Sequence, residues 1–201
     1  MADRLYNLLK PGFNSLTAES TFVDVSNILA KGLRNWFKTT LTKQISNVNG
    51  TVTYPNGATT TIVNQPALRE VNTNLPFTGA GIMAALANGE TGFASLYQYI
   101  GVTLTATSII WNGLPYFQIT SSSIPVTTHF YTLGTMLYAE TSILKAPETE
   151  DESLKLTEKI WSLFEKYLKL GINSIPIQVV PCVGSMYGGV FNGTAIIKFS
   201  C

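Results

Sequence analysis

Apolar side chains recur at helical spacing in a segment near the amino end of the chain. Over residues 20–44 they return every three or four positions, which is the period of an amphipathic helix. Asp24 near the start and Lys38 and Lys43 near the end suit the partial charges at the two ends of a helix. The apolar positions are Phe22, Val25, Leu29, Leu33, Trp36, Phe37 and Leu41.

A second segment, residues 153–170, has the same period and predicts a second helix. Gly171 follows it, and glycine is common just beyond the end of a helix. Each helix would have one apolar face and one wet face, so we expect both to pack on one side of a sheet. The apolar positions of the second helix are Leu156, Ile160, Leu163, Tyr167 and Leu170.

Asn-Gly pairs divide much of the remaining chain. Both residues of this pair tolerate the positive φ that tight hairpin turns demand. Asn56-Gly57 separates residues 51–54 from residues 59–63, so we predict a hairpin there. The pairs begin at Asn49, Asn56, Asn88, Asn112 and Asn192.

Residues 102–111 alternate between apolar and Thr positions, which is the pattern of a strand. The pair at 112–113 then joins this strand to residues 116–120 in a second hairpin. A membrane helix over residues 92–111 is the alternative, because that segment has no charge. A spanning helix needs about 20 predominantly apolar residues, and this one contains Gln98 and several Thr and Ser. The strand is therefore favoured.

The carboxyl-terminal tail is predicted to be a three-stranded meander, which bears on the two cysteines. Cys182 and Cys201 would lie at the same end of that sheet, on strands separated by a third. Two strand spacings make about 10 Å, whereas a disulfide needs Cα atoms within about 7 Å. We therefore expect two thiols, as in a protein assembled inside a cell. The predicted strands are 175–183, 186–191 and 194–200, with turns at 184–185 and 192–193.

These elements predict an α+β fold. Its largely antiparallel β-sheet has hairpins and is packed by the N-terminal helix and by the helix near 153–170. Residues 124–130 are predicted to form a further strand, and the chain becomes helical again between 132 and 145. The chain is long enough for one substantial core, so we expect an N-terminal arm over 1–19 and a single domain over 20–201.

Charge is distributed unevenly along the chain. Between Lys43 and Glu140 the only charged side chains are Arg69, Glu70 and Glu90. Over the whole chain 12% of residues are charged, about half of the roughly 25% typical of soluble domains. The net charge is only +1, and the basic residues are spread thinly along the N-terminal and C-terminal helices. The sequence therefore has no electrostatic footprint for a nucleic acid, and we expect no specific nucleic-acid contact.

Nucleophilic catalysis would require His129, the only histidine, to lie beside Ser185 or Cys182. The residues around Ser185 do not form the Gly-x-Ser-x-Gly turn of hydrolases. One histidine and two distant cysteines also lack the ligand spacing of a zinc site. We read His129 as a strand or loop residue without a catalytic role.

Other candidate sites are weak as well. The acidic run 148–152 lacks the turn glycine and the final bidentate Glu of a calcium loop, so it is interpreted as a solvated helix start. Gly79 and Gly81, followed by a possible short helix through Ala87, lack the further residues of a phosphate-binding loop. Nothing fixes the separation of Glu70 and Glu90. The sequence therefore predicts no catalytic residues, cofactor or metal, and no enzyme.

The uncharged middle of the chain is rich in Thr and in aromatic residues. Charge is depleted at the cores of protein interfaces, where aromatic residues and Met are enriched. We expect about half of the large side chains in this region to fill the core and the others to contact neighbouring subunits. They are Tyr97, Tyr99, Trp111, Tyr116, Phe117, Phe130, Tyr131, Met136 and Tyr138.

A polar N-terminal arm, Thr-rich hairpins and few charges together resemble the virion structural subunits of tailed phages, such as capsid, neck and tail-ring proteins. The resemblance covers composition and element order, and it carries no specific motif. It implies a subunit of a neck, tail junction or capsid-associated ring, in contact with copies of itself and with other virion structural proteins. In such a ring, residues 1–19 would be ordered on a neighbour and a hairpin over 48–63 would add strands or contacts.

Two further expectations concern location and the alternative function. Residues 1–12 carry Asp3, Arg4 and Lys10 without an apolar run, so they are not a secretory signal. We expect assembly in the host cytoplasm, location in the virion and no contact with a membrane. The alternative is a ligand-binding or adhesion domain, whose Tyr, Trp and Asn side chains would recognise carbohydrate or another neutral ligand.

Overall fold

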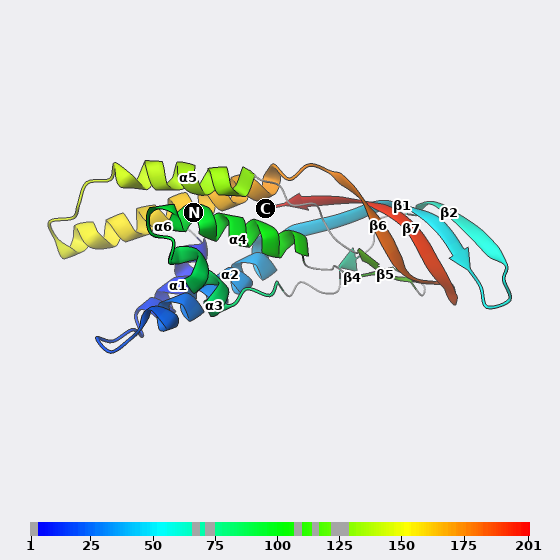
Figure 1. The fold of residues 1–201 in the computed structure, drawn as a ribbon, viewed down its shortest axis with the longest axis horizontal. Helices are drawn as coiled ribbons and strands as arrows, with labels where there is room; N and C mark the ends of the chain where they lie inside the picture. The colour runs from blue at the N-terminus through cyan, green and yellow to red at the C-terminus, as the bar shows by residue number, and fades with distance from the viewer. Residues whose placement is uncertain (1–3, 66–68, 71–74, 107–109, 114–116, 122–128) are drawn as a thin grey trace. The chain divides into compact units, whose positions relative to one another are not determined.

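The computed structural model describes residues 4–65, 69–70, 75–106, 110–113, 117–121 and 129–201 (Figure 1). It confirms the α+β class. The chain divides into two compact units, one helical and one built on a sheet. The helical unit comprises 1–40, 75–103 and 127–172, and the sheet unit comprises 41–74, 104–126 and 173–201.

The helices of the helical unit bury apolar side chains against one another. Trp36 meets Phe37 edge-on at 5.0 Å between ring centroids, and Phe37 stacks on Phe77 at 5.2 Å. The Tyr97 ring packs edge-on against Phe164 at 5.0 Å, and its hydroxyl donates to the Phe164 carbonyl. The elements are α1 (Arg4–Phe13), α2 (Phe22–Thr40), α3 (Gly79–Leu86), η1 (Gly89–Thr91), α4 (Gly92–Ala106), α5 (His129–Ser142) and α6 (Glu150–Asn173).

The two predicted helices are α2 and α6, with different ends. α6 runs past Gly171, which was expected to stop it, because Gly171 is where the helix lies against α5. A Cβ there would stand 3.0 Å from both Phe130 Cε1 and Leu133 Cδ1, so the glycine permits a close approach. Leu170, expected in the apolar stripe, is exposed. That both helices cover the sheet stays a prediction.

The N-terminal arm predicted over 1–19 is corrected for most of its length. Residues 4–13 form α1, and Leu5 and Leu9 are completely buried within the chain's own helical unit. The Leu5 N–H donates to the buried carboxylate of Glu165, and Phe13 contacts the Trp161 ring. These residues are therefore ordered on their own chain and not on a neighbour.

The predicted strand over 102–111 is wrong for its first half. Residues 102–106 belong to α4, and β4 (Ile110–Gly113) begins only later. Leu96, Tyr97 and Ile100 are buried with helical spacing, and Leu104 continues the same stripe. Tertiary burial of this stripe outweighs the β-propensity of the intervening Thr residues. No helix among the described residues is both long and apolar enough to cross a membrane.

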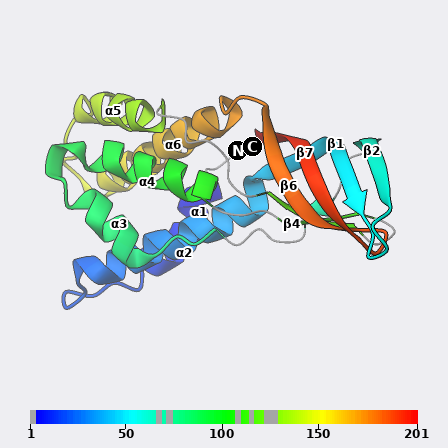
Figure 2. The same ribbon diagram turned by 45° about the vertical axis from the view of Figure 1, so that its right-hand side comes forward.

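The sheet unit contains one antiparallel sheet whose described strands have the order β2-β1-β7-β6-β5-β4-β3. Figure 2 shows β2, β1, β7 and β6 side by side. The inner face carries its core, and the strand register alternates this face with exposed residues. The buried inner residues include Ile45, Val52, Ile62, Val180, Met186, Phe191 and Ile197. The strands are β1 (Thr42–Thr53), β2 (Thr59–Gln65), β3 (Arg69–Glu70), β4 (Ile110–Gly113), β5 (Phe117–Ser121), β6 (Gln178–Met186) and β7 (Gly189–Ser200).

The hairpin predicted at Asn56-Gly57 is confirmed as the connection between β1 and β2. The Gly57 N–H donates to the Tyr54 carbonyl, and the Tyr54 N–H donates to the Ala58 carbonyl, each at 2.9 Å. Gly57 has φ +82°, which a glycine adopts without strain. The second hairpin pairs β4 with β5, Gly113 opposite Phe117, and its loop residues lie outside the described residues.

The predicted three-stranded meander is corrected to a two-stranded hairpin. β6 continues to Met186, the turn is at 187–188, and β7 runs unbroken through Asn192-Gly193. Gly193 lies opposite Gly50 of β1, and a Cβ on Gly193 would stand 2.1 Å from the Asn49 carbonyl oxygen. Both of these Asn-Gly pairs therefore serve close contact between strands and not turns.

The remaining predictions have mixed outcomes. Cys182 and Cys201 are thiols, as expected, although Cys182 lies opposite Gly193 in a hairpin and not in a meander. Of the strand predicted over 124–130, His129 and Phe130 lie in α5, and the remainder lies outside the described residues. The helix predicted between 132 and 145 is α5. The single domain over 20–201 stays a prediction beside the two compact units.

Candidate subunit interface

One face of the sheet, here called the outer face, exposes uncharged side chains from four neighbouring strands. Val183 of β6 lies opposite Asn192 of β7, which lies opposite Thr51 of β1, which lies opposite Thr61 of β2. All four are exposed, so this row crosses the sheet on one face. The outer face is made up of Thr51, Thr53, Thr59, Thr61, Val63, Val179, Pro181, Val183, Ser185, Val190, Asn192 and Thr194.

Large apolar side chains stand out from this face. Val63 and Val179 are each 68% exposed, Val190 is 59% exposed and Val183 is 52% exposed. Valines and threonines fit a pleated strand through their branched β-carbon, which accounts for the strands themselves. The exposure of the four valines has no such local explanation, because a strand facing water ordinarily carries polar and charged side chains there.

The charges of β1, β2, β6 and β7 are limited to Lys43 and Lys198. Lys43 is buried on the inner face, opposite Phe199, and Lys198 points outward, opposite Gln44. Both therefore lie at the end of the sheet away from the hairpin loop between β1 and β2. The outer face as defined carries no charge, so a partner could cover it without dehydrating an ion.

A shallow depression continues the outer face at the hairpin loops. Its volume is about 410 Å³, and its lining is uncharged. Tyr54 and Pro55 contribute from the loop after β1, while Gly188 and Val190 contribute from the turn and the start of β7. The depression could receive a side chain of a neighbour or a small neutral ligand.

The aromatic residues expected to make contacts fall into two groups. Tyr97 and Phe130 are buried in the helical unit and contribute to its core. On α5, Tyr131, Met136 and Tyr138 are exposed by 40–46%, so they stay available for contact. Tyr99 is half-buried, and the side chains of Trp111, Tyr116 and Phe117 lie outside the described ones.

The α5 surface is a weaker candidate for an interface than the outer face, because it includes the acid Glu140, which is bonded within the chain. Glu140 accepts a 2.7 Å hydrogen bond from the Tyr167 hydroxyl and lies 3.6 Å from Lys166. The Tyr167 hydrogen bond, followed by the nearby Lys166, lowers the pKa of the Glu140 carboxyl. This acid therefore helps to hold α5 against α6.

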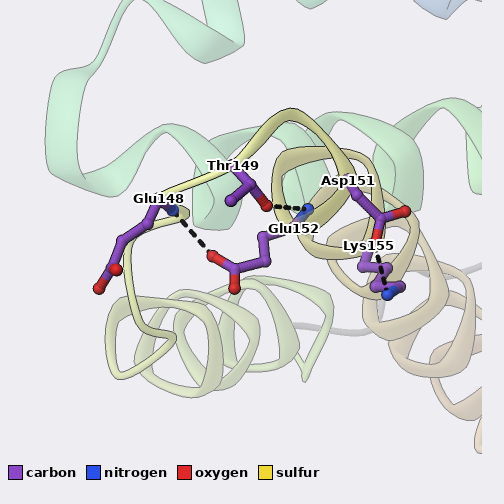
Figure 3. A network of polar contacts seen from close by, with 5 residues as sticks. All are labelled: Glu148, Thr149, Asp151, Glu152 and Lys155. Carbon is purple, nitrogen blue, oxygen red and sulfur yellow. Dashed lines mark hydrogen bonds and ion pairs between the residues drawn. The ribbon is translucent and has the colours of Figure 1, made fainter.

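The acidic run 148–152 lies at the start of α6, which begins at Glu150 and so takes in the last three of these residues, earlier than the predicted start at 153 (Figure 3). The Thr149 hydroxyl oxygen accepts the Glu152 N–H at 3.2 Å, and the Glu152 carboxylate accepts the Glu148 N–H at 2.9 Å. Asp151 forms a 2.5 Å ion pair with Lys155 one turn later. Among the described residues no cluster of His, Cys, Asp or Glu could hold a metal ion.

Three residues were considered for nucleophilic catalysis, and each lies in a different environment. His129 begins α5, and its Nε2 lies 3.1 Å from the Gly171 carbonyl oxygen of α6. Burial raises the pKa of the Cys182 thiol to about 11, so this thiol is protonated at neutral pH. Ser185 is exposed on the outer face. The side chains of Glu70 and Glu90 lie outside the described ones.

The glycines considered for phosphate binding have a packing role at the start of α3. Thr78 caps this helix, its hydroxyl oxygen accepting the Gly81 N–H at 3.1 Å. A Cβ on Gly81 would stand 2.5 Å from the Tyr99 ring, and one on Gly79 would stand 2.0 Å from the Asn27 side chain. Both glycines therefore lie within α3 and not in a loop, and they permit close packing against Tyr99 and Asn27.

Sequence reasoning missed the outer face, because it assigned β7 as two strands and placed the start of β1 too late. Val179, Val183 and Val190 are typical strand residues, and nothing in the sequence around them distinguishes an exposed from a buried valine.

Comparison with known proteins adds no relative: no family model, no curated protein and no solved structure matches this chain.

Proposed function

We propose that this protein is a structural subunit of a large protein assembly and acts through contacts with neighbouring subunits. The single observation that carries the proposal is the outer face, where exposed valines and threonines from four strands meet no charge. A strand face turned to water ordinarily carries charged side chains among its polar ones, and this face has exposed valines among uncharged polar residues instead. Interface cores are likewise depleted of charged residues.

The specific form of the proposal is a virion subunit of the tailed-phage type, in a neck, a tail junction or a capsid-associated position. It rests on the part of the resemblance that concerns the few charges and the Thr-rich hairpin of β1 and β2, since most of the N-terminal arm is the helix α1. In this form the subunit is assembled in the host cytoplasm, and its partners are copies of itself and other virion proteins. Contacts between unlike surfaces on successive copies would close into a ring or a shell.

Sedimentation velocity combined with electron microscopy of the purified protein tests the proposal. Rings, shells or other defined oligomers at micromolar concentration are the expected result. A monodisperse monomer that also binds no other virion component would overturn it. Microscopy adds the symmetry of the particle, which sedimentation alone does not give.

A second candidate function, recognition of a neutral ligand such as a carbohydrate, is supported by the depression beside Tyr54. An aromatic ring next to uncharged polar groups is a common arrangement for binding sugars by stacking. Binding of a glycan that is lost in Tyr54→Ala but kept in Tyr131→Ala, on the α5 surface, would favour this candidate. An assembled wild-type protein without glycan binding would favour the structural subunit.

A further inference from the structure

The strand β2 stands at an edge of the sheet. It pairs with β1 on one side, and no described strand lies on its other side (Figure 2). An edge strand presents backbone N–H and C=O groups that another extended strand can bind. The backbone groups that β2 presents at this edge therefore determine what kind of strand fits it.

The hairpin geometry determines which residues of β2 face the edge. Tyr54 and Ala58 form a hydrogen-bonded pair, and antiparallel pairs alternate between bonded and non-bonded. Thr59 opposite Thr53 and Thr61 opposite Thr51 are consequently non-bonded pairs. The N–H and C=O groups of Thr59 and Thr61 thus point away from β1.

Little on β2 protects this edge against pairing. Natural edge strands are commonly protected by Lys, by Pro or by a bulge. The strand Thr59–Gln65 contains neither a charged residue nor a proline. Its irregularity comes late, at Asn64, where φ is +50° and the N–H donates to the Asn49 side chain at 2.8 Å. Residues 59–62 are left as a regular, uncharged edge, because the register with β1 shifts between Ile62 and Gln65.

We propose that β2 pairs in antiparallel orientation with β2 of a second copy of this chain. The inference rests on the proposed function, because it names one contact through which the subunits would associate. A strand edge turned by a two-fold axis presents donors to acceptors and acceptors to donors, so this edge is complementary to itself. The absence of charge on β2 removes the like-charge repulsion that would oppose such a pair.

The backbone N–H and C=O groups that point away from β1 determine the register of the proposed β2–β2 pair. With the two-fold axis at Thr61, Thr61 lies opposite the partner's Thr61, and Thr59 lies opposite the partner's Val63. Thr59 and Thr61 then use their outward backbone groups. The outer faces of the two subunits become one continuous surface. Because the contact is isologous, an assembly that contains it has an even number of subunits.

A cysteine cross-link tests this register. Thr61→Cys, in a Cys201→Ser background, should give a covalent dimer under mild oxidation, because bonded antiparallel partners have Cα atoms about 5.5 Å apart. Thr59→Cys is the matched control, since it has the same strand, face and parent residue. Two copies of residue 59 would be offset by four residues, about 13 Å along the strand. Equal cross-linking of the two variants would overturn the register.

A proline substitution separates this contact from the proposed function. Thr61→Pro removes an N–H that points outward and leaves the β1 pairing bonds in place. We expect at least a tenfold loss of self-association by sedimentation velocity, with Thr61→Val unchanged. If the wild type and Thr61→Pro assemble equally, the β2 pairing is wrong while the proposed function stands. A wild type that stays monomeric overturns the pairing, and the proposed function is then decided by binding to other virion components.

Discussion

Glu165 is a buried acid, and each of its two carboxylate oxygens has a polar partner. The residue is 2% exposed on α6. One oxygen accepts the Leu5 N–H at 2.8 Å, and the other lies 2.6 Å from Lys169 Nζ. Leu5 belongs to the first turn of α1, where backbone N–H groups have no partner inside the helix. Glu165 therefore caps α1 from a distant part of the chain.

Replacing Glu165 should destabilise the protein and change its response to acid. Burial, the largest influence, raises the pKa of this carboxyl, but the hydrogen bonds from Lys169 and Leu5 leave it below its ordinary value of 4.5. A lowered pKa gives stability that is complete above the unfolded-state value and is lost as the pH falls through the folded-state value. Glu165→Gln should cost about 1–3 kcal/mol of unfolding free energy at neutral pH.

Urea unfolding at pH 7 and at pH 3 measures both effects. The loss caused by Glu165→Gln should be smaller at pH 3, where the wild-type carboxyl is also becoming protonated. Glu158→Gln is the control, because Glu158 is exposed on the same helix. Equal losses for the two variants at pH 7 would show that Glu165 does not secure α1.

Gly193 is a second residue with little freedom to change. A Cβ there would meet the Asn49 carbonyl oxygen at 2.1 Å and the Gly50 Cα at 2.7 Å. These are backbone atoms of the neighbouring strand, which cannot rotate away as a side chain can. We expect Gly193→Ala to lower the unfolding free energy by about 1–3 kcal/mol. Thr194→Ala, at the next and exposed position, is the control in the same thermal or urea measurement.

At the scale of the element, the start of α6 combines a capping residue with acids in the first turn. Thr149 and Glu152 satisfy two backbone N–H groups there (Figure 3). Thr149→Ala should lower the unfolding free energy by about 1 kcal/mol, the usual effect of losing an N-terminal cap. Thr157→Ala is the control, because its hydroxyl bonds only the Ser153 carbonyl within the helix. If the two variants have equal midpoints in urea, the cap contributes nothing.

The helices show how far local pattern predicts an element. The sequence predicts α2 and α6, because a long helical repeat of apolar residues indicates a helix whatever the helix packs against. Residues 102–106 were misassigned, since alternating Thr residues mimic a strand and the buried stripe that makes α4 a helix includes Leu96 and Ile100, outside the alternating segment. The sequence pattern and the tertiary burial conflict there, and burial determines the outcome.

The Asn-Gly pairs show why turns were only partly predictable. Asn56-Gly57 follows Pro55, which favours a turn by fixing its own φ, and it forms the predicted hairpin. Asn49-Gly50 and Asn192-Gly193 have no such neighbour and lie within paired strands. Glycine is needed there because two backbones approach closely, a requirement that arises only when distant strands meet. For the same reason the outer face could not be predicted from single strands.

At the scale of the whole molecule, charged and uncharged surfaces lie on different parts of the chain. The helix α6 begins with Glu150, Asp151 and Glu152, whereas the residues that define the outer face carry no charge and Lys198 lies beyond them on the same side of β7. An association built on this face should depend little on ionic strength, because salt screens charges and leaves apolar burial in place. Sedimentation at low and at about 1 M salt should give the same oligomer. Dissociation by salt would indicate that charged contacts hold the subunits together.

A single charge placed on the outer face should separate assembly from folding. Val183 is 52% exposed, so Val183→Lys should change the unfolding free energy of the subunit by less than about 0.5 kcal/mol. In an interface the same lysine would be dehydrated without a partner, and we expect the subunit Kd to rise about a hundredfold or more. Leu154→Lys, at a 45% exposed position on the acidic start of α6, is the matched control and should assemble normally. If both variants assemble as the wild type does, the outer face is not where the subunits meet, and the α5 surface around Tyr131 and Tyr138 becomes the next candidate.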